Sequence, residues 1–225
     1  CLFLLSACGY TGDPEIQHHV YKSQIETVQS AVNQYHKDTG VLPIKTRPQK
    51  TPIYQKYPID FDRLVKKYLP DPPENSYLKG GIYEYVLVNA EKNPTVKVID
   101  LTTVDKVQEV QRRVDMFRAK HGFSPLKDVI VNKRYSLDYK AMGYQNPPTI
   151  KSPFTGRDLD FVIDTKSKVH IDYRSDLYAF LKKYGDDYQK GEDIRNILVK
   201  HSPFVPVDSF PYTVNNKGEP IFLVK

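Results

Sequence analysis

The sequence contains no tryptophan, and its only two cysteines, Cys1 and Cys8, lie at its start. A metal site built on them is excluded, because their spacing is wrong and no nearby CxxC pair or group of histidines completes four ligands. The absence of cysteine beyond residue 8 is typical of an exported protein that avoids thiol chemistry. Without tryptophan, the core has to be built from the 17 tyrosines, the 10 phenylalanines and the aliphatic residues.

Long apolar runs are also missing. The stretch Leu2–Ala7 is much shorter than the roughly 20 residues that span a bilayer, and no other segment comes closer. No run of four basic residues occurs, although the chain carries 33 Lys and Arg against 27 Asp and Glu, and a net charge of +6. We therefore expect no nucleic acid as a partner, whereas the basic balance favours anionic surfaces such as lipid headgroups or cell-wall polymers.

The motifs of catalysis and cofactor binding are absent as well. There is no Gly-x-Ser-x-Gly, no His-x-x-x-His and no glycine-rich loop that opens a helix, since Gly80-Gly81 precedes a strand pattern. His36 and His121 fall in the last turns of two predicted helices, where a cation complements the helix dipole. The sequence thus predicts no enzyme, no cofactor and no metal site.

Two aspartates, Asp60 and Asp138, recur at matching places and could be the paired carboxylates of a glycan hydrolase. We expect each to cap a short helix instead, because an aspartate side chain accepts hydrogen bonds from free backbone N–H groups. Tyrosines in the loops and strands could stack on sugars or bind a peptide, but the lack of tryptophan favours a role in the core with the hydroxyl at its rim. These tyrosines are Tyr54, Tyr57, Tyr83, Tyr85, Tyr135, Tyr139 and Tyr144.

The first apolar stretch ends in Leu5-Ser6-Ala7-Cys8, followed by Gly9. This segment resembles the lipobox of bacterial lipoproteins, in which Leu, a small residue and Ala or Gly precede an invariant Cys. The resemblance implies that Cys8 receives a diacylglyceryl group and that residues 1–7 are the remnant of a signal peptide. Two acyl chains give stable attachment, so membrane lipid is an expected partner through Cys8, and the outer face of the cytoplasmic membrane is the expected location.

Three blocks recur in the same order, which predicts an internal duplication. "VQSAVNQYHKDTGVLP" (28–43) aligns with "VQRRVDMFRAKHGFSP" (110–125), and "YPIDF" (57–61) aligns with "YSLDY" (135–139). A hairpin pattern at 82–101 recurs at 159–173, with "TVKVID" matching "KVHIDY". The predicted organisation is a lipidated Cys and tether at 8–15, a first unit at 16–101, a second unit at 102–174, and C-terminal helices with a hairpin at 175–225.

Each unit is predicted to consist of a long helix, a loop with a short helix, and an antiparallel hairpin. Apolar residues spaced by three and four mark the long helices, and Gly40 and Gly122 end them. Thr102 with Asp105 is predicted to cap the second long helix, and Ser175 to cap a later one. Further predicted elements are a short helix at 61–69, a helix at 192–201, and hairpins at 81–100, 159–173 and 211–225. Helices and hairpins without βαβ alternation predict an α+β fold.

Two further resemblances concern the layout of the chain. The helix-end turns "TGVLP" and "HGFSP", each followed by a loop and a hairpin, resemble the soluble half of bacterial type II pseudopilins. The long apolar helix that packs pilins into a filament is absent from both repeats, so this resemblance implies the shape alone. The opening "ACGYTGD" and the overall layout are similar to uncharacterised Gram-positive lipoproteins of the YphF type, some of which are labelled as transporter binding proteins.

Three classes of function follow from these features. We expect a non-enzymatic, membrane-anchored binding or assembly module of the cell envelope, whose partner is an envelope protein or a cell-wall polymer. The first alternative is a solute-binding lipoprotein of an ABC transporter, although two-lobed receptors of that kind usually need more chain and βαβ repeats. The second alternative is a cell-wall hydrolase that would use Asp60 and Asp138.

Overall fold

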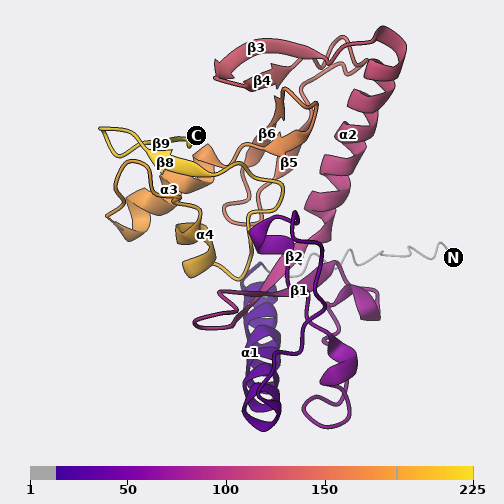
Figure 1. Ribbon diagram of the computed structural model, residues 1–225, viewed down its shortest axis with the longest axis vertical. Coiled ribbons are helices and arrows are strands. Elements are labelled where there is room, and N and C mark those ends of the chain that lie inside the picture. Colours follow the sequence, from indigo (N-terminus) through magenta and orange to yellow (C-terminus); the bar gives the residue numbers. More distant parts are fainter. Residues whose placement is uncertain (1–13, 186, 225) are drawn as a thin grey trace, which may run out of the picture.

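The fold is α+β, with helices and antiparallel sheets (Figure 1). The computed structural model describes residues 14–185 and 187–224, with side chains from residue 22 onward. The first unit consists of α1 (Pro14–Thr39) and a hairpin of β1 (Tyr83–Val88) and β2 (Thr95–Asp100). Short 3₁₀ turns lie between α1 and β1, at Ile53–Gln55, Phe61–Arg63 and Tyr77–Lys79.

The second unit repeats this plan with a larger sheet. α2 (Leu101–His121) is followed by β3 (Leu126–Val131), β4 (Arg134–Leu137), β5 (Thr149–Lys151), β6 (Asp158–Asp164) and β7 (Val169–Ile171). These strands form one sheet in the order β3-β4-β6-β5, with β7 paired to β6. The chain closes with α3 (Arg174–Tyr184), α4 (Asn196–Lys200) and a hairpin of β8 (Tyr212–Val214) and β9 (Pro220–Phe222). Figure 1 shows α1 and α2 extending toward opposite ends of the long axis, with the C-terminal elements at the side between them.

Both long helices are attached to their hairpins by the same pair of hydrogen bonds. On α1, the Gln29 amide accepts from Val96 N (2.7 Å) and donates to the carbonyl of Pro94 (3.1 Å). On α2, Gln111 accepts from Val169 N (2.8 Å) and donates to the Ser167 carbonyl (2.9 Å). Gln29 and Gln111 occupy the same position of the aligned helix blocks. The two copies of the sequence repeat therefore share one helix-to-hairpin joint.

The ends of the two helices also match. Gly40 (φ +73°) and Gly122 (φ +79°) take the left-handed conformation, and the N–H of each donates to the carbonyl four residues earlier at 2.8 Å. This geometry confirms the two predicted C-terminal caps. Beyond each cap, the N–H of Asp60 or Asp138 donates to the carbonyl of the proline that follows its helix, at 2.8 Å in both units.

The predicted N-terminal caps are wrong by a few residues. α2 begins at Leu101, and its cap is Asp100, whose carboxylate accepts from the N–H of Thr102 at 2.9 Å. Thr102 is thus already inside the helix. In the same way, the carboxylate of Asp172 accepts from the backbone N–H that opens α3 at 3.0 Å, and Ser175 lies within α3. In both cases the aspartate lies at or just beyond the end of the preceding strand: α2 follows β2 directly, and two residues separate α3 from β7.

The short helix predicted at 61–69 is reduced to one 3₁₀ turn, because Lys66 takes a left-handed backbone conformation (φ +78°) that ends helical winding. Asp60 does not cap this turn, and its carboxylate instead accepts from Arg63 Nε at 3.1 Å. The carboxylate of Asp138 accepts from the N–H of Ala141 at 3.1 Å, but the segment that follows is a turn at 139–143 and not the predicted short helix. The two recurring aspartates therefore differ in role.

The core confirms the packing role of the strand tyrosines. Tyr83 and Tyr85 on β1 are 6% and 1% exposed, and the Tyr85 hydroxyl donates to Asn75 Oδ1 at 2.7 Å. Burial raises the pKa of Tyr85 to about 12, with the Asn75 hydrogen bond acting against it. The other five tyrosines of the predicted set are half-buried. A buried ring with a satisfied hydroxyl thus supplies the bulk that tryptophan would otherwise give.

The glutamine joint gives a first prediction. Gln29→Ala should lower the free energy of unfolding by about 1–3 kcal/mol, because it removes the side-chain partners of two backbone groups in the hairpin. Urea denaturation measures this loss, and Gln111→Ala should lose a similar amount. Gln34→Ala is the matched control, since Gln34 bonds only to the exposed Asp38 (2.8 Å) on the same helix. An equal loss in the control would contradict the role of the joint.

Candidate functional site

An extended segment, residues 203–209, links the two hairpins; we refer to it as the strap. The carbonyl of Pro203 accepts from Val98 N (3.0 Å), and Val205 N donates back to the Val98 carbonyl (3.2 Å). At its other end, the carbonyl of Asp208 accepts from Ile171 N (3.0 Å). Val98 and Ile171 hold the same position in the aligned hairpin blocks. The strap therefore contacts both units at matching places.

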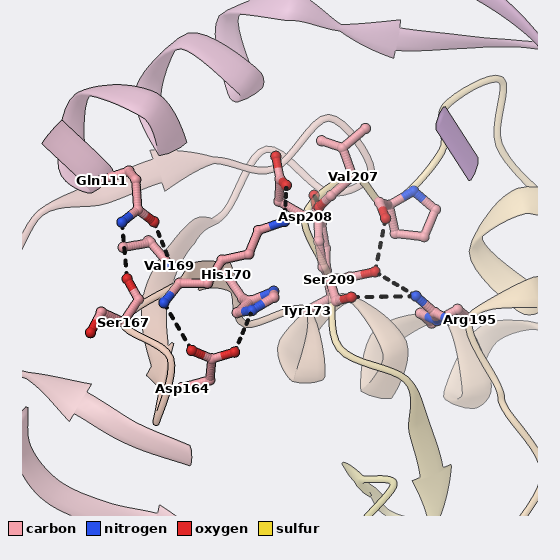
Figure 2. Close-up of polar contacts among 12 residues, drawn as sticks. Gln111, Asp164, Ser167, Val169, His170, Tyr173, Arg195, Val207, Asp208 and Ser209 are labelled. Carbon is pink, nitrogen blue, oxygen red and sulfur yellow. Dashed lines mark hydrogen bonds and ion pairs between the residues drawn. The ribbon is translucent and has the colours of Figure 1, made fainter. Parts of the chain in front are cut away.

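Side chains from the C-terminal part hold the strap in place (Figure 2). The buried Tyr173 hydroxyl donates to the Val207 carbonyl at 3.2 Å. Arg195 Nη1 donates to Ser209 Oγ at 3.0 Å, while the rest of its guanidinium binds the Asp193 carboxylate, with Nε–Oδ1 at 3.0 Å. Because Val207 is 2% exposed as well, the strap is fixed by both burial and hydrogen bonding.

A cavity of about 510 Å³ opens between the two units beside the strap; we refer to it as the crease. The first unit contributes an ion pair between Arg47 and Glu84, with Nη2–Oε1 at 2.5 Å. The second unit and the strap contribute Lys168 and Asp208, with Nζ–Oδ1 at 4.0 Å. Apolar side chains of β2 and α2 also line it, namely Ile99, Leu101, Val104 and Val107, and the rest of the lining is Gln55, Tyr77, Gln108, Gln111 and Val169.

Asp208 is a largely buried acidic residue of the crease. Its backbone is left-handed (φ +45°), an uncommon conformation for a residue other than glycine, and its side chain is only 14% exposed. Burial raises the pKa of its carboxyl group, and the nearby ammonium of Lys168 opposes that shift. Ser167, next to Lys168, also has a left-handed backbone (φ +66°). Ser167 takes this conformation within the turn between β6 and β7, where its N–H donates to the Asp164 carbonyl at 3.0 Å.

His170 lies close to this ion pair, on β7. Its ring packs against Phe210 at an interplanar angle of 32°, with the centroids 3.9 Å apart. Its Nε2 lies 3.7 Å from Asp164 Oδ2 (Figure 2). Burial lowers the pKa of His170 to about 4, and the carboxylate of Asp164 opposes this. The imidazole is therefore neutral at pH 7 and adds no charge next to Lys168 and Asp208.

The crease offers both donors and acceptors beside apolar side chains of β2 and α2. Arg47 and Lys168 can donate to a carboxylate, and Glu84 and Asp208 can accept from an amine or a hydroxyl group. The cavity volume falls in the range of small-molecule sites, roughly 300–1,000 Å³. This arrangement suits a ligand that carries groups of both kinds, such as an amino acid, a short peptide end or an amino sugar.

The residues singled out from the sequence lie elsewhere. Asp60 and Asp138 do not line the crease, and Cys8 lies outside the described residues. Tyr54 and Tyr57 line a separate groove of about 640 Å³ together with Lys56. Within residues 14–185 and 187–224 there is no group of three or more metal-ligating side chains, and no helix there is long and apolar enough to cross a bilayer.

Sequence reasoning missed the residues of the crease, namely Arg47, Glu84, Lys168 and Asp208. One feature of the sequence points toward the strap: the prolines at 203, 206 and 211 indicate an extended segment there. That spacing does not say which strands the segment contacts.

Comparison with known families supports one of the resemblances. Residues 21–100 match the YphF family N-terminal domain. The match confirms the similarity to the YphF type over β1, β2 and most of α1, and it ends one residue before α2 begins. No curated protein and no solved structure matches the chain. The lipobox and the similarity to pseudopilins stay predictions.

The buried histidine gives a second prediction. Because the pKa of His170 is about 4 in the folded protein and about 6.5 in the unfolded chain, only the unfolded chain gains this proton between these values. The free energy of unfolding should therefore fall as the pH drops from 6.5 to 4, by about 3 kcal/mol from this residue. Urea unfolding at several pH values measures the slope.

The variant His170→Gln should flatten that slope relative to the parent protein. Comparing the two removes the contribution of Asp208, whose raised carboxyl pKa acts in the opposite direction. Lys37→Gln, at an exposed position near the end of α1, is the control and should leave the slope unchanged. Parallel curves for the parent and His170→Gln would contradict the assignment.

Proposed function

We propose that the protein is a non-enzymatic binding module of the bacterial cell envelope, held on the outer face of the cytoplasmic membrane by a lipid on Cys8. The four residues Leu5-Ser6-Ala7-Cys8 support the anchor. The match to the YphF family N-terminal domain supports the relation to YphF-type lipoproteins. The anchor would keep the binding surfaces close to the membrane and to the polymers outside it.

The crease carries the binding part of the proposal. It combines an ion pair from the first unit with another from the second unit and the strap. The acidic group of a ligand could bind Arg47 or Lys168 while its amino group binds Glu84 or Asp208. Every charge in the crease would then keep a partner of opposite sign, which keeps the free-energy cost of desolvation low. Envelope peptides and amino sugars have such groups, and so do the free solutes that transporter receptors bind. The solute-binding alternative thus uses the same site.

The anchor gives a third prediction. Cys8→Ala, expressed from the native gene, should move the protein from the membrane fraction to the medium or the soluble fraction, because the acyl chains would have no attachment point. Immunoblotting of the two fractions measures this. Cys1→Ala is the matched control, since it changes the other cysteine and leaves Leu5–Cys8 intact. Membrane retention of the Cys8 variant would contradict the anchor.

The crease gives a fourth prediction. Thermal-shift screening against amino acids, short peptides and cell-wall fragments should find a stabilising ligand. Isothermal titration should then show binding at least about tenfold weaker for Asp208→Asn and Lys168→Gln, because each variant loses a charged hydrogen-bond partner. Lys166→Gln, in the exposed turn next to the crease, is the control and should bind like the parent.

The outcomes separate the alternatives. Stabilisation by free solutes but not by wall fragments favours the solute-binding lipoprotein. Turnover of a wall fragment, lost in Asp208→Asn, would overturn a non-enzymatic role. Binding that is unchanged in both crease variants would place the ligand elsewhere.

A further inference from the structure

The end of α1 is covered by a side chain of the same unit. Tyr68 packs edge-on against Tyr35, with the ring centroids 5.3 Å apart. Its hydroxyl donates to Asp38 Oδ2 at 3.1 Å, and Lys67 Nζ lies 3.3 Å from the same oxygen. An aromatic ring, a hydrogen bond and an ion pair thus close the hollow beside this helix end.

The end of α2 is covered less completely, because the ring that meets Phe117 edge-on is Phe123, which lies just beyond the helix cap and is itself 62% exposed. The aligned blocks place Phe117 where the first unit has Tyr35, and Lys120 where it has Asp38. After Met142 the chain turns away at Gly143, whose left-handed backbone (φ +82°) permits the turn. The next aromatic side chain, Tyr144, lies against Arg113 instead, with its ring centroid 4.3 Å from the guanidinium carbon.

The hollow left beside α2 has a volume of about 480 Å³; we refer to it as the α2 notch. It is lined by Arg113, Met116, Phe117, Lys120, His121, Ala141 and Met142. Met116 is 72% exposed, and Phe123, at the rim, is 62% exposed. The ring of Phe117 stacks on His121 (4.3 Å) and meets the edge of Phe123 (5.5 Å). Large apolar side chains gathered at an exposed hollow indicate an interaction site.

We propose that the α2 notch binds an aromatic side chain flanked by carboxylates, presented by a partner protein. The first unit supplies the template, since a tyrosine fills the equivalent hollow there. The charge at the rim is reversed, because Lys120 replaces Asp38, and Arg118 and His121 lie within the same turn of α2. The occupant should therefore carry acidic groups where the segment that holds Tyr68 carries the basic Lys67.

The two methionines of the chain provide the test, because Met116 and Met142 both line the notch. The protein labelled with ¹³C at the methionine methyl groups is titrated with the acetylated peptide Glu-Asp-Tyr-Asp-Glu, followed by NMR. Both methyl signals should shift and saturate. The peptide Lys-Lys-Tyr-Lys-Lys should bind at least about fivefold more weakly, a difference that a few exposed charge pairs supply.

Variants on the surface separate the contributions without disturbing the core. Lys120→Glu should weaken binding of the acidic peptide by about fivefold or more, and Phe123→Ser should also weaken it by removing apolar contact. Lys37→Glu makes the same charge change at an exposed position of α1 and should have no effect.

Three results would overturn the proposal. One is the absence of methyl shifts with the acidic peptide, and another is equal binding of the acidic and basic peptides. The third is a response of the methyl signals to phosphatidylglycerol vesicles but not to the acidic peptide, which would assign the notch to an anionic lipid surface.

Discussion

The arrangement of the two units depends on the backbone pairing of the strap with Val98 and Ile171. Each hairpin presents the same edge position to the strap, so one extended segment can serve both. The strap also brings Val205 and Val207 into a third core cluster, together with Val86, Val88 and Ile99 of the first hairpin and Val199 of α4. The strap thus buries side chains of the first hairpin that lie outside the core packed against α1, and it places Asp208 in the lining of the crease.

The differences between the two copies are more informative about function than their shared joint. Gln29 and Gln111 make the same bonds, and the glycine caps end both helices in the same way. The glutamine bonds and the glycine caps serve folding, so both copies need them and both copies have them. The helix ends differ, because one hollow is closed by Tyr68 and the other is open and basic. A difference of this kind does not follow from the needs of the shared fold, so it points to a contact made by one copy only.

The parts of the fold that the sequence predicts are those set by local signals. The α+β class, the two long helices and the three hairpins follow from apolar spacing and from glycine and proline positions. The helix predicted at 192–201 is shortened to α4, and the N–H of Ile194, which lies before it, donates to the carbonyl of Tyr212 (2.9 Å) in a distant strand. The crease could not be predicted for the same reason, since Arg47 and Asp208 meet only once the strap has joined the two hairpins.

α2 connects the two proposed sites, because Leu101, Val104 and Val107 at its start line the crease, while Lys120 and His121 at its end line the notch. Between these ends, Gln111 ties the helix to β7 and to the turn before it. In conformational transitions a packed helix shifts by translation or rotation as a unit. A ligand in the crease could therefore influence a partner at the notch only by moving the whole helix against its hairpin. That movement would break the glutamine joint, which leaves two independent sites as the simpler arrangement.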